Sequence, residues 1–318
     1  MTRTFLQVLS DGVPAQVPAT RRLRTLALVG STLVLVLAAV GYLAFGGARH
    51  GLTPAAPPPP GCQAGTGVSA IPLDTGQAGI AATIAGVAAR HRLPRQAVTI
   101  ALAAALQESQ LQNLGYGDRD SVGVFQQRPS QGWGTAAELQ DPVYATTKFF
   151  AALVRVRGYA KMPVGQAAQD VQHSADGYAY GQWVAVATLL AGYFTGAPQA
   201  GVSCWYTPAA KPDVAGALSQ LTQTFGPQGK DGVLVGITTA RSGQKKEDRS
   251  VAVVHVQRAG AWTVAGWLVA HAQQYGISQI RYAGYVWKAT DGSMGWQRDS
   301  NPTPPSGKSV SQGDIVAG

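Results

Sequence analysis

The residue whose chemistry stands out in this sequence is Glu108, one of only three glutamates in 318 residues. It follows a stretch over residues 96–106 that carries no charge and is rich in alanine. A carboxylate at the end of such a stretch loses hydration when it ionises, so we expect its pKa to be raised. A carboxyl group that keeps its proton near neutral pH can act as the general acid in glycosidic-bond cleavage. The alternative is that Glu108 marks where a helix reaches solvent.

The element that must position this acid is a helix predicted from Pro94 to Ser109. Proline suits the first turn of a helix, because its missing N–H would have no partner there. One apolar stripe runs along the helix, with Glu108 on its flank, and consists of Val98, Ala101, Leu102 and Ala105. That position favours a partly buried acid.

A glycine-rich segment over residues 115–134 follows the helix and reads GYGDRDSVGVFQQRPSQGWG. Glycine allows the backbone to approach a ligand closely, and the polar and aromatic residues supply hydrogen-bond donors and rings that stack on sugars. We therefore expect a loop or short hairpin beside the acid.

These motifs resemble a known family. Glu108-Ser109 followed by Gly123-Val124-Phe125-Gln126-Gln127 resembles the "ES" and "GLMQ" motifs of lysozyme-like lytic transglycosylases of the SLT type, with Val-Phe in place of the usual Leu-Met. The longer string through residue 134, with DPVYA at 141–145 and AAQDVQHSA at 167–175, is similar to a subgroup of membrane-anchored actinobacterial cell-wall proteins. The similarity covers residues 62–206.

The resemblance implies a mainly α-helical lysozyme-like domain that cleaves the MurNAc–GlcNAc β-1,4 bond of peptidoglycan glycan strands without a cofactor. Glu108 would be the single catalytic residue, first protonating the leaving oxygen and then taking the proton of the sugar 6-hydroxyl. Tyr180 would take the place of the motif tyrosine that lies under the acid. The residues implied to bind substrate are Ser109, Gly123, Phe125, Gln126, Gln127 and Tyr180.

Two alternatives remain open. A lysozyme-type muramidase hydrolyses the bond with two carboxylates, and Asp120 is the candidate for the second one. We expect Asp118 and Asp120 instead to cap a loop or to pair with Arg119 and Arg128. The other alternative is a catalytically inactive, membrane-tethered scaffold that binds the cell wall.

The N-terminal region predicts a membrane anchor. The segment over residues 25–47 carries no charge and is long enough to span a bilayer. Arg21, Arg22 and Arg24 precede it. We expect a cytoplasmic N-terminus (1–24), a single transmembrane helix (25–47) in the cell membrane, a proline-rich linker (48–61) and extracellular C-terminal domains. A cleaved signal peptide is the alternative, although its apolar core is normally shorter.

Charge and cysteine content add to this picture. The formal net charge is +9, but no helix carries a basic stripe and no nucleic-acid motif is present, so nucleic acid is not an expected partner. A basic exterior portion suits an anionic cell wall.

Cys62 and Cys204 bracket the proposed catalytic domain, and an oxidising location and the resemblance both favour a disulfide over two free thiols. Two cysteines and scattered histidines do not indicate a metal site.

The pattern changes after residue 206. We expect a connecting helix in 207–227, strands at 232–240 and 250–257, a helix at 263–275 and one or two strands within 277–288. These elements would form a small α+β accessory domain over 228–298, followed by a disordered tail over 299–318. The predicted fold class is therefore α+β: an N-terminal transmembrane helix, a mainly α lysozyme-like domain and a small α+β domain.

The C-terminal region also carries a looser resemblance. GWLVAHA at 266–272 and YVW at 285–287 resemble an accessory domain related to the hedgehog/D-Ala-D-Ala peptidase fold. His255 and His271 do not stand in the zinc-binding motif of that fold. We therefore expect this domain to have no catalysis of its own.

Overall fold

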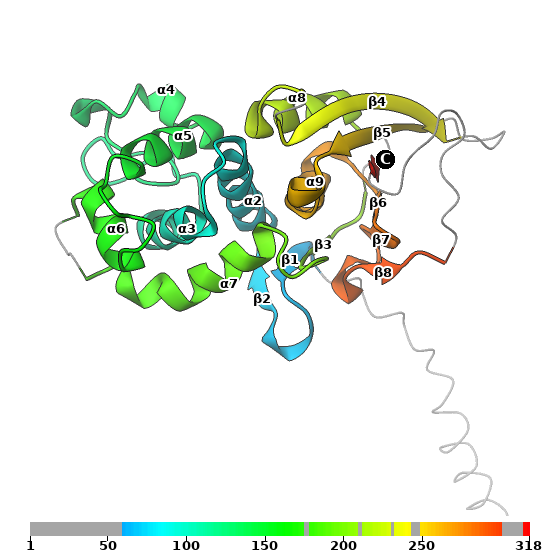
Figure 1. Ribbon diagram of the computed structural model, residues 1–318, viewed down its shortest axis with the longest axis horizontal. Helices are drawn as coiled ribbons and strands as arrows, with labels where there is room; N and C mark the ends of the chain where they lie inside the picture. Colours follow the sequence, from blue (N-terminus) through cyan, green and yellow to red (C-terminus); the bar gives the residue numbers. More distant parts are fainter. Residues whose placement is uncertain (1–58, 175–177, 209–211, 230–231, 243–248, 301–313) are drawn as a thin grey trace, which may run out of the picture. The chain divides into compact units, whose positions relative to one another are not determined.

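A computed structural model describes residues 59–318 apart from 175–177, 209–211, 230–231, 243–248 and 301–313. Within these residues, eight α-helices and two antiparallel sheets confirm the mixed α+β class (Figure 1). No helix of the described part of the chain is both long and apolar enough to cross a membrane. The transmembrane helix predicted at 25–47 lies outside the described residues, as do the cytoplasmic segment and most of the linker.

Six α-helices lie between the two cysteines: α2 (Thr75–Arg90), α3 (Arg95–Ser109), α4 (Ala136–Leu139), α5 (Pro142–Leu153), α6 (Val164–Gln172) and α7 (Val184–Phe194). Helix α3 is central, because it packs against α2, α5, α6 and α7. Its residues 97–106 are buried all round, which explains why the stretch before Glu108 carries no charge. The helix predicted from Pro94 to Ser109 is observed as α3, and α7 begins only after a 3-10 turn, Gly181–Trp183.

A three-stranded sheet joins the two ends of this helical part. Strand β1 (Gly61–Ala64) lies between β2 (Ile71–Leu73) and β3 (Val202–Trp205), and both pairings are antiparallel. Cys62 lies opposite Cys204 in the β1–β3 register, and the two form the expected disulfide. The strands have only three or four residues, too few for a period-two pattern to be read from the sequence.

The C-terminal part begins with α8 (Val214–Phe225) and contains α9 (Ala261–Tyr275) and a six-stranded antiparallel sheet. The sheet has the strand order β4-β5-β9-β6-β7-β8. Its strands are β4 (Leu234–Ser242), β5 (Arg249–Val256), β6 (Gln279–Tyr282), β7 (Tyr285–Lys288), β8 (Gln297–Arg298) and β9 (Asp314–Ala317). The expected strands, and the helix between β5 and β6, are therefore present.

Strand β9 corrects the expectation that the whole of 299–318 is disordered. Residues 314–317 pair with β5 on one side and with β6 on the other, inside the sheet. Asp314 also accepts a hydrogen bond from His255 Nδ1 at 2.7 Å. The polar composition of the tail concealed this strand, because its pairing partners in β5 and β6 are 35 to 65 residues away along the chain.

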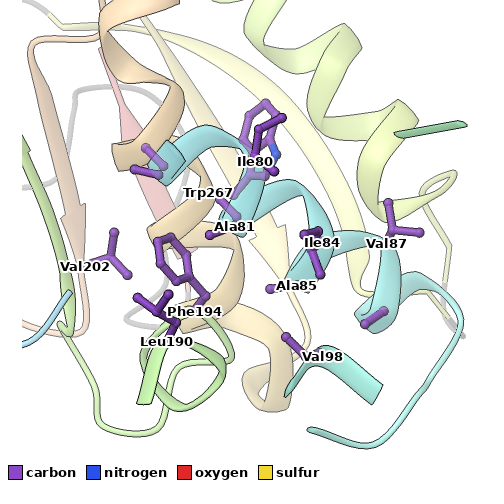
Figure 2. Packing of buried hydrophobic residues seen from close by; sticks show 14 of the residues in the cluster. Ile80, Ala81, Ile84, Ala85, Val87, Val98, Leu190, Phe194, Val202 and Trp267 are labelled. Carbon is purple, nitrogen blue, oxygen red and sulfur yellow. The ribbon is translucent and has the colours of Figure 1, made fainter. Parts of the chain in front are cut away.

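One hydrophobic core runs through both parts of the described unit. Helix α9 packs against α2 and β3, and its Trp267 is fully buried. Figure 2 shows side chains from α2, α3, α7, α9 and β3 in this cluster, among them Ile84, Val98 and Phe194. Gly86 allows α8 to approach α2, since a Cβ there would lie 2.5 Å from Thr224 Cγ2.

Candidate active site at the end of helix α3

The last turn of helix α3 directs three successive residues, Gln107, Glu108 and Ser109, toward three different neighbours. The helix ends sharply because Gln110 adopts the left-handed conformation, with φ 55°. The N–H of Leu111 then bonds the carbonyl of Ala105 at 3.1 Å, as in a Schellman motif. The helix end that carries the acid is therefore held by its own backbone.

Glu108 is half-buried and accepts a hydrogen bond from the Tyr180 hydroxyl, with 2.6 Å between Oη and Oε1. Burial raises the pKa of Glu108, while hydrogen bonds from Tyr180 and Gln172 act in the opposite direction. Tyr180 is completely buried, and this burial raises the pKa of its phenol well above the usual value. The phenol consequently remains a donor, and one carboxylate oxygen of Glu108 has a fixed position.

Gln107 holds the segment that carries Tyr180. Its side-chain oxygen accepts hydrogen bonds from Trp183 Nε1 at 2.8 Å and from Gln182 Nε2 at 3.1 Å. Both donors belong to the 3-10 turn that directly follows Tyr180. The residue before the acid therefore positions the partner of the acid.

Ser109 holds the glycine-rich loop. It is buried, its Oγ lies 2.7 Å from the carbonyl oxygen of Val124 and 3.1 Å from that of Ala105, and it accepts a bond from Gln112 N. These bonds occupy the hydroxyl inside the protein. The structure thus replaces the expected contact of Ser109 with substrate by a positioning role, in which it fastens the glycine-rich loop to α3.

The glycine-rich loop contains a tight turn, which is closed by an isolated antiparallel β-bridge between Val122 and Gln127. Phe125 is fully buried within this turn and stacks on Phe149, with 4.5 Å between ring centroids. Gln127 is also buried, and its Nε2 donates to Ala145 O at 3.3 Å. Phe125 and Gln127 were expected to bind substrate, but they are core residues, because the turn points them toward α5.

Gly123 and Gln126 behave differently from each other. Gly123 is buried with φ 79°, and a Cβ there would lie 2.3 Å from Leu139 O, so only glycine fits this close approach. It therefore shapes the turn. Gln126 is the one predicted loop residue that is not buried, and its Nε2 donates to Tyr116 O and Gly123 O at 3.3 and 3.2 Å. Of the loop residues predicted to bind substrate, Gln126 is thus the one whose side chain is partly exposed.

Gln172, at the end of α6, was not singled out from the sequence. Its Nε2 donates to Phe125 O at 2.7 Å, and its side chain also bonds Glu108. Gln172 further lines a cavity of about 540 Å³, together with Trp133, Arg155, Asp170 and His173. It therefore connects the acid to a hollow large enough for a sugar or peptide group. Nothing distinguished it in the sequence from its neighbour Gln169.

The remaining acids of the loop have other partners. Asp120 accepts hydrogen bonds from Arg128 Nε and Ser130 N, each at 2.7 Å, and these bonds hold its pKa far below the usual range. Asp118 is exposed and lies 3.9 Å from Arg119. Asp120 is thus a clamp within the loop. Among the described residues, no group of His, Cys, Asp and Glu is arranged to hold a metal ion.

Comparison with known proteins adds no assignment to this geometry. No protein-family model matches the chain, and no curated protein gives a significant match. The motif resemblance and the arrangement around Glu108 are therefore the grounds for a functional proposal.

Proposed function

We propose that this protein is a membrane-anchored peptidoglycan lytic transglycosylase that cleaves the MurNAc–GlcNAc β-1,4 bond with Glu108 as its only catalytic residue. The observation that carries the proposal is the half-buried Glu108 carboxyl, held by the Tyr180 hydroxyl at 2.6 Å. Burial raises the pKa of this carboxyl, which keeps more of it protonated near neutral pH than an exposed glutamate would be.

The chemistry needs one carboxyl group in two successive roles. The Oε2 atom, which is not bonded by Tyr180, donates its proton to the glycosidic oxygen as the C1–O bond breaks. The resulting carboxylate then takes the proton of the 6-hydroxyl, whose oxygen attacks C1 and closes a 1,6-anhydro ring. The Tyr180 donor stabilises the carboxylate between the two steps. Water is not a reactant, and the enzyme returns to its protonated form.

The bonding of Asp120 favours this route over hydrolysis. A muramidase of the usual type needs a second carboxylate that is free to attack the sugar or to activate water. Both oxygens of Asp120 instead accept hydrogen bonds from Arg128 and Ser130, and its lowered pKa is due to those bonds. A carboxylate engaged in this way is a poor nucleophile and a poor base.

The proposed setting is the exterior of the cell membrane. The anchor predicted at 25–47 and the proline-rich linker would place the site within reach of the cell wall. The disulfide between Cys62 and Cys204 agrees with an oxidising compartment.

The decisive experiment incubates the full-length protein with isolated sacculi and identifies the released fragments by mass spectrometry. We expect muropeptides with 1,6-anhydro ends, and we expect Glu108→Gln to lower their release at least about 100-fold, as loss of a general acid does. Glutamine retains an oxygen that accepts from Tyr180, so the fold is preserved. The matched control is Glu138→Gln, which alters an exposed capping residue of α4 and should retain full activity.

The other outcomes separate the alternatives. Reducing ends without the anhydro product would replace the transglycosylase by a hydrolase. Binding to sacculi without any release of fragments by the unaltered protein would leave only the wall-binding scaffold.

A further inference from the structure

A second cavity, of about 620 Å³, lies between helices α2, α5, α8 and α9 and is not lined by Glu108 or its partners. It is formed where the lysozyme-like helices meet the C-terminal part of the chain. The polar and ionisable side chains that line it include Thr83, Asp141, Gln220, Gln223, Gln274 and His271. The proposed cleavage of glycan strands makes no use of any of them.

His271 and Thr83 form one wall of the cavity. The Nδ1 atom of His271 lies 2.9 Å from the carbonyl oxygen of Trp267, which can only accept, so Nδ1 carries the hydrogen. Burial lowers the pKa of His271 to about 4, with the bond to Trp267 acting in the opposite direction, and the ring is neutral at pH 7. The Nε2 atom therefore has a lone pair, and it lies 3.5 Å from Thr83 Oγ1.

Asp141 supplies a negative charge at the opposite side. Its Oδ1 accepts from Val143 N at 2.9 Å as the N-cap of α5, and its Oδ2 accepts from Gln223 Nε2 at 3.2 Å. A carboxylate has about four acceptor sites, so this group can accept further hydrogen bonds from a ligand. Glutamine carboxamides around it can both donate to and accept from amide groups.

The charge of the cavity defines which ligands fit. The chain has 25 lysines and arginines against 16 acidic residues, yet neither lysine nor arginine lines the cavity. Phosphates and carboxylates therefore find no cation here, whereas an ammonium group would meet Asp141. A sugar ring would find no exposed aromatic face, because the His271 ring is stacked on Trp267, with 4.0 Å between centroids.

We propose that this cavity binds a short peptide segment that carries a free primary amine. The ammonium group pairs with Asp141, the peptide amides bond the glutamine carboxamides, and a ligand N–H donates to Nε2 of His271. The site is separate from Glu108, and the proposal holds whether or not the protein cleaves glycan.

The test measures binding to the full-length protein by isothermal titration calorimetry. The probe is an alanyl-lysyl-alanine peptide with both termini blocked and the lysine amine free, and its comparison is the same peptide with that amine acetylated. We expect the free amine to bind at least about tenfold more tightly, a difference of about 1.4 kcal/mol, because acetylation removes the charge-assisted hydrogen bond to Asp141. Asp141→Asn should remove this difference while retaining a good N-cap for α5.

A second variant tests the histidine wall. At Gly79 a Cβ would lie 3.5 Å from His271 Nε2, so Gly79→Ala covers the lone pair at ordinary contact distance and suits the helix. We expect it to weaken binding of both peptides. The matched control is Asp118→Asn, which removes an exposed carboxylate outside the cavity and should change nothing.

Two results would overturn the proposal: equal binding of the free and the acetylated peptide, or no binding of either. In the second case, saturable binding of an N-acetylglucosamine oligomer that Gly79→Ala abolishes would assign the cavity to a sugar instead. The activity on sacculi is measured separately with the Glu108 variant, so failure of one proposal does not imply failure of the other.

Discussion

At the scale of single residues, Glu108 is subject to two opposing influences. Burial raises the pKa of its carboxyl, and the hydrogen bonds from Tyr180 and Gln172 lower it. Burial alone would destabilise the carboxylate, so the carboxyl group would be slow to give up its proton to substrate. The two donors give the ionised form a defined place, which a residue acting first as acid and then as base needs.

Tyr180→Phe tests this balance. The variant keeps the buried ring but removes the donor that stabilises the charged carboxylate, so the pKa of Glu108 rises further. Activity requires protonated Glu108, is present below that pKa and is lost as the pH rises through it. The decline of kcat/KM should therefore move to higher pH, because one charge-assisted hydrogen bond to the carboxylate is lost.

The pH profile of fragment release from sacculi provides the measurement. Tyr178→Phe is the control, because Tyr178 is 93% exposed and two residues away. An unchanged decline in Tyr180→Phe would contradict a role for this hydroxyl in the proton transfer.

At the scale of elements, the end of helix α3 organises the site. Successive helical residues point about 100° apart, so three neighbours in sequence reach three separate segments. Gln107 bonds the 3-10 turn after Tyr180, Glu108 bonds Tyr180 itself, and Ser109 bonds the loop at Val124. The motif "Gln-Glu-Ser" therefore connects helix α3 to two other segments of the chain.

Ser109→Ala tests how much this motif contributes to stability through the contact with Val124. The buried carbonyl oxygen of Val124 loses its donor, which costs about 1–3 kcal/mol of unfolding free energy. Urea denaturation measures the loss. Thr188→Ala is the control, because the exposed hydroxyl of Thr188 bonds only Val184 O in its own helix, and we expect a change within about 0.5 kcal/mol. Equal stability of the two variants would show that Ser109 does not fasten the loop.

At the scale of the whole described unit, the last residues of the chain are part of the C-terminal sheet. Strand β9 lies between β5 and β6, and the carbonyl oxygen of Gly318 accepts hydrogen bonds from Ser278 N and Gln279 N at 2.9 Å each. The chain end therefore joins strands that are far apart in sequence. Without β9, β5 and β6 would each present an unpaired edge.

Two neighbouring residues of β9 give a matched test of this arrangement. Ile315 is fully buried in the core, whereas Val316 is half-buried on the other face of the strand. Ile315→Ala should lower the free energy of unfolding by about 2–5 kcal/mol, and Val316→Ala should cost clearly less. Chemical denaturation of both variants measures these losses of unfolding free energy. Losses of the same size in the two variants would mean that β9 has no single inward face.

The sequence by itself determined the elements whose signals are local. The uncharged stretch before Glu108 predicted a buried helix, branched residues predicted β4 and β5, and the glycine-rich segment predicted an irregular loop, because each pattern lies within one continuous stretch. The pairing of Cys62 with Cys204 also followed from location and resemblance, and the structure confirms it.

Only the tertiary structure decided which side chains of the motifs face inward. Ser109, Phe125 and Gln127 stand in the recognised motifs but are buried, whereas Gln172 comes to the site from another helix. The short strands β1 to β3 and the terminal strand β9 were likewise hidden. The physical reason is the same in each case: burial and strand pairing depend on contacts between residues distant in sequence, which no local pattern of residue types records.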